Sequence, residues 1–179
     1  GRGGGEGGAE QALGGGGLIH PKGVGALRQG GVEWGGEVVA PLADFPFAEV
    51  LAYDRTCFPA PRPSFLTGWI DQPEGLALGC RRDGRLAGYG VVRRCREGCK
   101  VGPLFADDAQ VAEALYAGLA GFAAGGPLFL DVPENNVLGL ELARRHAMVD
   151  VFGCARMYLG PLPALAHERI FGVTTFELG

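Results

Sequence analysis

The sequence predicts a mixed α/β domain in which helices cover a sheet of antiparallel and parallel strands. Two observations carry this prediction. Residues 76–105 contain three strand-like runs separated by tight turns, which is typical of an antiparallel meander. Residues 99–132 then give a strand, an amphipathic helix and a second strand, and such a unit places its two strands parallel with a right-handed crossover. Together the two units require a mixed sheet.

Glycine divides the 179-residue chain into two parts. Sixteen of the 33 glycines lie in residues 1–36, where bulky apolar side chains are few. Such a stretch buries little surface and is costly to order, because glycine loses more conformational freedom on folding than any other residue. We therefore expect residues 1–36 to be disordered and residues 37–179 to form one domain of ordinary size.

Two short helices are predicted at the start of this domain. Asp44 is a suitable helix N-cap, and apolar residues follow it at helical spacing as far as Asp54. The proline-rich run 58–63 must end this helix. Ser64 is a suitable cap for a second helix, which closes before Pro73.

The three-stranded meander is the strongest local signal. Its strands are predicted at residues 76–82, 85–95 and 99–105. Asp83-Gly84 separates the first two strands, and this dipeptide favours a type I′ hairpin turn because both residues tolerate positive φ. The three strands are therefore expected to be antiparallel neighbours.

The period of the apolar pattern then changes. Asp107 and Asp108 precede an apolar stripe at helical spacing over residues 108–124, and acidic residues are typical of a first helical turn. The short apolar run 128–132 is typical of a buried parallel strand. The remaining elements are a helix over 136–146 and strands at 149–159 and 171–178. The predicted order is α-α-β-β-β-α-β-α-β-β.

Composition excludes several classes of function. The net charge of −4 gives no uniform positive field, so no nucleic acid is expected as a partner. No apolar run approaches the roughly 18 residues of a membrane span, so no membrane association is expected. The five cysteines are odd in number and scattered, which favours reduced thiols in the cytoplasm. No metal site is expected, because Cys95 and Cys99 lack a second pair of ligands.

A ligand site is expected where two of the predicted strands end. Strands 99–105 and 128–132 are joined by a helix, and ligands bind in the crevice outside the carboxyl ends of such parallel strands. The helix that begins near Asp108 offers free backbone N–H groups and the positive end of its dipole. Both features suit a phosphate group.

Several runs of residues, in order, resemble the GNAT superfamily of acyltransferases. They are YDRTCFPAPRPSFL, DGRLAGYGVVRRC, KVGPLFADDAQVAEAL, PLFLDVPENNVLGLELARRHAM, ARMY and the terminal FGVTTFELG. The resemblance covers residues 38–179, and it is closest to the C-terminal GNAT-like domain of two-domain acetyltransferases. It implies the GNAT-like acyl-CoA N-acyltransferase fold. It also implies transfer of an acetyl group from acetyl-CoA, by direct attack, to an amine on a small molecule or a protein.

The same resemblance implies where acetyl-CoA binds. In that family the donor lies between the strands that match 99–105 and 128–132. Its pyrophosphate meets backbone amides at the start of the following helix. The matching residues are Phe105, Ala106, Asp108, Ala109, Gln110 and Val111. The family's asparagine at the start of the second helix matches Asn136.

Direct acetylation of an amine needs a base for the ammonium proton and an acid for the leaving thiolate. Glu134, which follows the predicted strand 128–132, is the candidate base. Its alternative role is turn and cap chemistry within Pro133–Asn136. Tyr158 is the candidate acid, and its alternative role is packing with a hydrogen-bonded hydroxyl group.

A second function stays open. Where the family has spaced glycines beside the phosphate, this sequence has FADDAQV at 105–111. No glycine there allows close backbone approach, and the carboxylates of Asp107 and Asp108 oppose an anion. The alternative is therefore a non-catalytic GNAT-like domain. Such a domain binds another ligand or packs against a partner, either another GNAT-like domain or a second copy in a homodimer.

Overall fold

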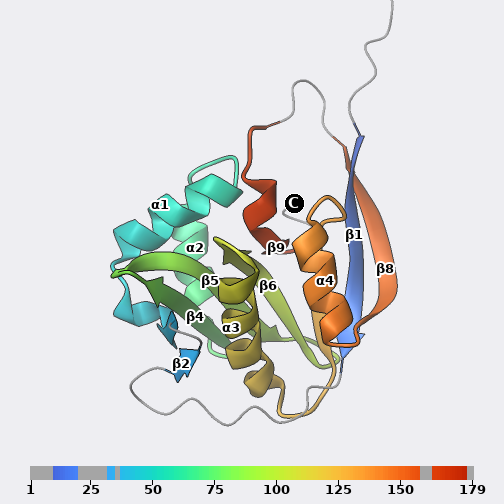
Figure 1. Ribbon diagram of the computed structural model, residues 1–179, viewed down its shortest axis with the longest axis horizontal. Coiled ribbons are helices and arrows are strands. Elements are labelled where there is room, and N and C mark those ends of the chain that lie inside the picture. Colours follow the sequence, from blue (N-terminus) through green and yellow to red (C-terminus); the bar gives the residue numbers. More distant parts are fainter. Residues whose placement is uncertain (1–9, 20–31, 35–36, 158–162, 177–179) are drawn as a thin grey trace, which may run out of the picture.

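A nine-stranded mixed sheet organises the structure (Figure 1). The computed structural model describes residues 10–19, 32–34, 37–157 and 163–176. The strands are β1 (Glu10–Ile19), β2 (Val32–Trp34), β3 (Glu37–Pro41), β4 (Gly75–Arg82), β5 (Arg85–Arg94), β6 (Cys99–Ala106), β7 (Leu128–Asp131), β8 (Val149–Met157) and β9 (Ile170–Gly172). Their order is β2-β3-β4-β5-β6-β7-β1-β8, and β9 pairs with β6.

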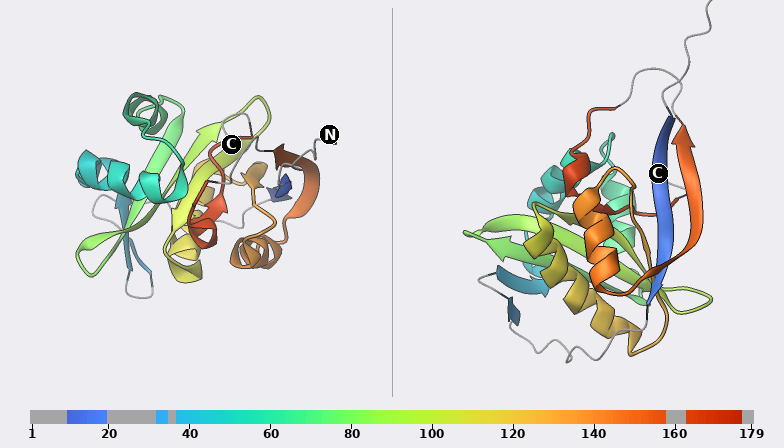
Figure 2. Two further views of the ribbon diagram at one scale, coloured as in Figure 1. Left: turned by 90° about the horizontal axis from the view of Figure 1, so that it is seen from above. Right: turned by 45° about the vertical axis from the view of Figure 1, so that its right-hand side comes forward.

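Four α-helices cover the two faces of this sheet in pairs (Figure 2). They are α1 (Phe47–Cys57), α2 (Pro63–Ile70), α3 (Ala109–Ala120) and α4 (Val137–Arg145). Short 3₁₀ turns lie at Leu42–Asp44, Gly121–Ala123 and His167–Arg169. In the ranges that the structure describes, every helix is too short or too polar to cross a membrane.

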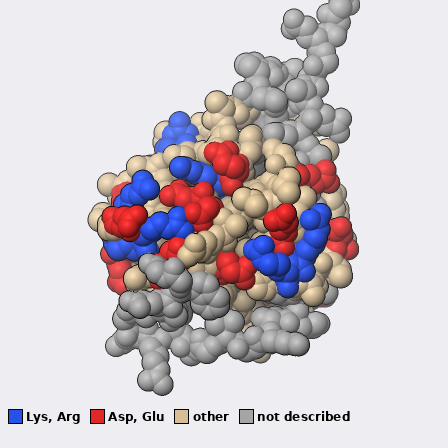
Figure 3. All heavy atoms as spheres, viewed as in Figure 1, with Lys and Arg blue, Asp and Glu red and all other residues tan. Residues whose placement is uncertain are grey.

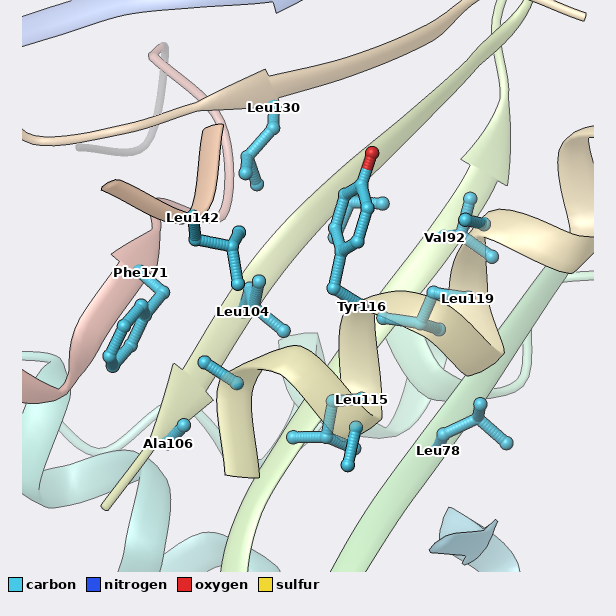
Figure 4. Close-up of a cluster of buried hydrophobic side chains, with 14 of the residues drawn as sticks. Leu78, Val92, Leu104, Ala106, Leu115, Tyr116, Leu119, Leu130, Leu142 and Phe171 are labelled. Atoms are coloured by element: carbon cyan, nitrogen blue, oxygen red, sulfur yellow. The ribbon is translucent and has the colours of Figure 1, made fainter. Parts of the chain in front are cut away.

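The sheet separates two hydrophobic cores. The first lies under α3 and α4, where Leu115 and Leu119 of α3 pack on Leu104 of β6 (Figure 4). The second lies under α1 and α2, where Val50 and Leu66 pack against the opposite face. Because β4, β5 and β6 are covered on both faces, their residues read as nearly continuous apolar runs.

The predicted fold class is confirmed. β4, β5 and β6 form the antiparallel meander, and β6 and β7 are parallel on either side of α3. Asp83 and Gly84 both have positive φ, at 51° and 78°, as a type I′ turn requires. Asp108 caps α3 and Asn136 caps α4 through their side chains, as their positions suggested.

The glycine-rich stretch contributes two strands that the sequence did not predict. β1 lies between β7 and β8 and is antiparallel to both, and β2 pairs with β3 at the opposite end of the sheet. A strand flanked on both sides satisfies its backbone groups through its neighbours, without bulky side chains of its own. The sheet therefore includes residues from both sides of the expected boundary at 36/37.

Some element ends differ from the prediction. Asp44 lies in a 3₁₀ turn and does not cap α1, which begins at Phe47 after Pro46. Ser64 does not cap the second helix, which begins at Pro63, two residues before the start that a cap at Ser64 implies. Proline's missing N–H costs nothing in this first turn. The final strand is only three residues long, Ile170–Gly172. β3 was also not predicted. Its five residues, Glu37–Pro41, are identified as a strand only by their pairing with β4.

Candidate functional site

β6 and β7 separate where the sequence placed the ligand crevice, because they pair over only three residues at their starts. Parallel pairing joins Cys99–Val101 to Leu128–Leu130 and goes no further. At the next two residues, Gly102 and Pro103, β6 carries one residue more than the facing stretch of β5. Such a bulge bends a strand. Beyond it, β6 runs on to Ala106 without β7 at its side.

The space between the diverging strands holds the C-terminal segment, residues 170–175. β9 pairs antiparallel with β6, with Gly172 opposite Leu104 and Ile170 opposite Phe105. On the other side, the amide N–H of Val173 donates to the carbonyl of Asp131 at the end of β7 (3.0 Å). The segment therefore bridges the two strands as an inserted short strand. All six of its residues are buried.

Asn136 is the main polar anchor of this segment. Its Oδ1 accepts from the backbone N–H of Gly139 (2.9 Å) and so caps α4. Its Nδ2 lies within hydrogen-bond distance of three carbonyl oxygens, those of His167 (3.3 Å), Glu168 (3.3 Å) and Ile170 (2.9 Å). The side chain is 3% exposed. The residue that the resemblance assigned to the donor thus holds the chain's own C-terminal segment.

At the start of α3, two backbone N–H groups are already hydrogen-bonded to the side chain of the helix's own N-cap, Asp108. Asp108 Oδ1 accepts from the backbone N–H groups of Gln110 (3.0 Å) and Val111 (3.1 Å), the donors that a phosphate would use. Arg82 donates to the same carboxylate and to Glu37. The hydrogen bonds from Arg82, together with those from the two amides, lower the pKa of Asp108. The cap is therefore an ionised carboxylate at the place expected for pyrophosphate.

Asp107 connects the same end of β6 to α1. Its Oδ1 accepts from the Tyr53 hydroxyl (2.9 Å) and lies 3.6 Å from Arg169 Nε, next to β9. Burial, with the Asp107 carboxylate as a second cause, raises the pKa of Tyr53, so the phenol stays protonated. Figure 3 shows acidic and basic side chains mixed together on the face that carries α3 and α4.

Glu134 follows Asp131, the last residue of β7, by three residues. It is exposed and lines an open groove of about 480 Å³ between α4 and β8. The other described lining residues are Leu140, Arg144, Asp150, Val151, Phe152 and Gly153. The groove combines the carboxylates of Glu134 and Asp150 with the guanidinium of Arg144 and an apolar wall, so its charged lining is negative by one unit.

The other expected site residues are placed as follows. The side chains of Phe105, Ala106 and Val111 are buried in the two cores. Ala109 is half-buried, and Gln110 is exposed and donates to Glu37 (3.0 Å). Tyr158 lies outside the described residues, so its role as acid stays a prediction. In the described part of the chain, no group of three or more His, Cys, Asp or Glu residues is placed to hold a metal ion.

Sequence reasoning missed the residues that close the crevice. The strand signal in FGVTTFELG was visible, but nothing local says that this strand pairs with β6 beyond the bulge. It also missed Lys100, whose Nζ lies 2.5 Å from Asp131 Oδ2 and 5.1 Å from the ring of Phe176. Such contacts depend on tertiary pairing and leave no short-range pattern.

Comparison with known proteins gives consistent matches. Residues 50–172 match a family model described as an acetyltransferase (GNAT) domain. Holothin acyltransferase from Pseudoalteromonas sp. (strain SANK 73390) is 24% identical over 132 residues, which are 73% of this chain and 45% of that protein.

Two solved structures show the same fold. A presumed acetyltransferase from Pyrococcus horikoshii has a TM-score of 0.68 at 23% identity, over 96% of this chain and 53% of that one. A GNAT-family acetyltransferase from Colwellia psychrerythraea has a TM-score of 0.57 at 15% identity, over 83% of this chain and 56% of that one. The chain spans about half the length of these relatives.

Proposed function

Because the chain belongs to the GNAT acetyltransferase family, we propose that it transfers an acetyl group from acetyl-CoA to an amine by direct attack. The observation that carries the proposal is the divergence of the parallel strands β6 and β7, directly before α3. In parallel sheets such a crevice is the usual ligand site, and a helix start beside it favours phosphate. The five free cysteines support the expected cytoplasmic location.

Glu134 is the proposed base for the acceptor amine. The groove between α4 and β8 offers two carboxylates, from Glu134 and Asp150, against the single cation of Arg144, which leaves one carboxylate for an ammonium group. In the proposed reaction the amine nitrogen attacks the thioester carbonyl and the C–S bond breaks. Glu134 takes the ammonium proton, and Tyr158 stays the proposed acid for the thiolate.

Calorimetric titration of the chain with acetyl-CoA tests the donor. We expect saturable binding, and a dissociation constant of about 1 mM or weaker would contradict the proposal. An acetylation screen over small amines and peptides then tests the base. Glu134→Gln should lower kcat about 10²- to 10⁴-fold with donor affinity unchanged. Glu141→Gln, an exposed position on α4, is the matched control.

A second candidate function is packing against another GNAT-like domain, and one surface favours it. β8 is the last strand of the sheet and leaves large apolar side chains exposed, and α4 adds two more beside it. They are Val149 (58%), Val151 (50%), Phe152 (62%), Met157 (78%), Val137 (62%) and Leu138 (42%). Exposed large apolar side chains gathered at one edge of a sheet favour protein–protein contact.

Sedimentation velocity tests this candidate, with a second copy of the chain as the partner. We expect concentration-dependent dimers that Phe152→Ser reduces, with Phe47→Ser, on the distant α1, as the control. A monomer at all concentrations, together with tight acetyl-CoA binding, would remove this candidate.

A further inference from the structure

We propose that the C-terminal segment, residues 170–175, and the acyl donor compete for the same edge of β6, so that the donor binds only when this segment is displaced. The inference rests on the proposed function, because it concerns the site of the donor. It adds to that site a state in which residues 170–175 pair with β6 and the donor is excluded.

Both edges of β6 are already taken beyond its bulge. On one side, β5 pairs with Leu104 and Phe105 through Gly90 and Tyr89. On the other side, β9 pairs with the same two residues. The arm of CoA carries two amide groups and can add to a strand edge as an extended peptide does. Neither edge is free for it here.

The segment also fills the width of the crevice. A Cβ added at Gly102 would collide with the backbone oxygens of Thr174 and Val173. A Cβ added at Gly172 would lie 2.5 Å from Leu130 Cδ1 and 3.3 Å from Leu104 Cβ. Contacts this close leave no room for a second extended chain between β6 and β7. The crevice can therefore hold the segment or the donor, and not both.

The anchoring of the segment combines strong and weak contacts. Phe171 is fully buried in the core under α3 and α4, while Ile170 and Val173 enter the opposite core. Pairing with β6 is limited to two residue pairs. Among the described residues, no hydrogen-bond partner reaches the buried hydroxyl of Thr174. Displacement therefore costs apolar burial. It also breaks the contacts of the Asn136 amide with the carbonyls of His167, Glu168 and Ile170.

Hydrogen exchange on the unmodified chain tests the competition directly. With saturating acetyl-CoA we expect the amides of Ile170–Gly172, and the Val173 amide bonded to Asp131, to exchange faster than in the free protein. Donor binding with unchanged or slower exchange across 170–175 would overturn the inference and leave the proposed function standing.

Asn136→Asp should weaken the anchoring of residues 170–175 and leave the N-cap of α4 in place. The new carboxylate can still accept from Gly139 N–H and cap α4, but it places an oxygen against the three carbonyls. Asn135→Asp makes the same change in charge at the adjacent exposed position and is the matched control. We expect acetyl-CoA to bind Asn136→Asp about tenfold more tightly than Asn135→Asp, because the competent state is more populated. Equal affinities would overturn the inference.

An engineered disulfide that holds residue 170 against β6 gives a third test of the competition. Phe105 and Ile170 are partners in the antiparallel pairing, next to an irregularity in its register. Paired residues of antiparallel strands have Cα atoms about 4.5–5.5 Å apart, which is within the span of a disulfide. In Phe105→Cys/Ile170→Cys, oxidation should abolish acetyl-CoA binding and reductant should restore it, while each single variant is indifferent to oxidant. Binding to the oxidised form would overturn the inference. Absence of binding in every variant and redox state would overturn the proposed function together with it.

Discussion

Asp108 shows how a single residue can build a helix and oppose a ligand. Its carboxylate satisfies two backbone donors at the start of α3 and pairs with Arg82. These contacts stabilise the helix start. The same negative charge lies where a phosphate would bind, so fold and donor affinity make opposite demands on this side chain.

Substitution at Asp108 separates the two demands. Asp108→Asn keeps an oxygen for the cap and removes the charge, so we expect acetyl-CoA to bind about three- to tenfold more tightly. Asp108→Ala also removes the cap, and we expect a loss of about 1 kcal/mol in the free energy of unfolding. Calorimetry and urea denaturation measure the two effects. Asp71→Asn, after α2, is the control, and unchanged affinity in both Asp108 variants would place the phosphate elsewhere.

From the contacts of Glu113 we expect the free energy of unfolding to decrease in acid. Hydrogen bonds from His146 and Arg145 lower the pKa of Glu113 below its ordinary 4.5. Because the folded state holds the ionised form more strongly, this stabilisation is present above pH 4.5 and is lost as the pH falls towards the folded pKa.

The Tm of Glu113→Gln, followed from pH 7 to pH 3, checks this sign. The variant should melt below the parent protein at pH 7, and the difference should shrink in acid. Glu141→Gln should show no such convergence. A difference that is constant with pH would mean that packing, and not charge, stabilises this contact between α3 and α4.

At the scale of elements, the hairpin turn, the caps of α3 and α4 and the parallel pairing of β6 with β7 were predicted correctly. The helix caps at Asp44 and Ser64, and the pairings of β1, β2 and β9, were not. Asp83-Gly84 and the capping positions of α3 and α4 act over one turn, so the sequence alone shows them. The insertion of β1 between β7 and β8, and of β9 beside β6, joins segments far apart in the sequence, and no short-range pattern specifies such pairings. The sequence therefore indicates where β6 and β7 separate, but not that residues 170–175 lie between them.

The first two helices are joined to the sheet by a buried ion pair. Asp54, at 0% exposure, accepts from Arg62 Nε (2.9 Å) and Nη2 (2.7 Å), and from the Tyr89 hydroxyl (2.6 Å). Arg62 also lies over the ring of Phe58, 3.8 Å from its centroid. This set connects α1, the start of α2 and β5, on the face opposite α3.

Breaking one half of this pair should be costly. We expect Arg62→Met to lower the free energy of unfolding by about 3–5 kcal/mol, because Asp54 would keep an uncompensated buried charge. The double variant Asp54→Asn/Arg62→Met removes that charge and should recover part of the loss. Urea denaturation of both variants measures this. A double variant that is less stable than Arg62→Met would contradict the explanation.

At the scale of the whole molecule, β1 joins β8 to the rest of the sheet. Without it, β7 would lose a neighbour and β8 would be detached from the path of the sheet. We expect deletion of residues 1–31 to lower the Tm by at least about 5 °C and to raise hydrogen exchange in β8. Deletion of residues 1–9, which precede β1, should change neither. Equal stability of the two truncations would instead favour a unit that begins at residue 37.

The position of β1 also has a consequence for synthesis on the ribosome. Between Ile19 and the first residue of β7 lie 108 residues, so β1 leaves the ribosome on the order of ten seconds before either of its partners exists. An apolar strand waiting that long would be prone to associate with other chains. The glycines at 14–17 have no side chains to pack against another chain. They should therefore reduce the association of this segment with other chains until β7 and β8 have been synthesised.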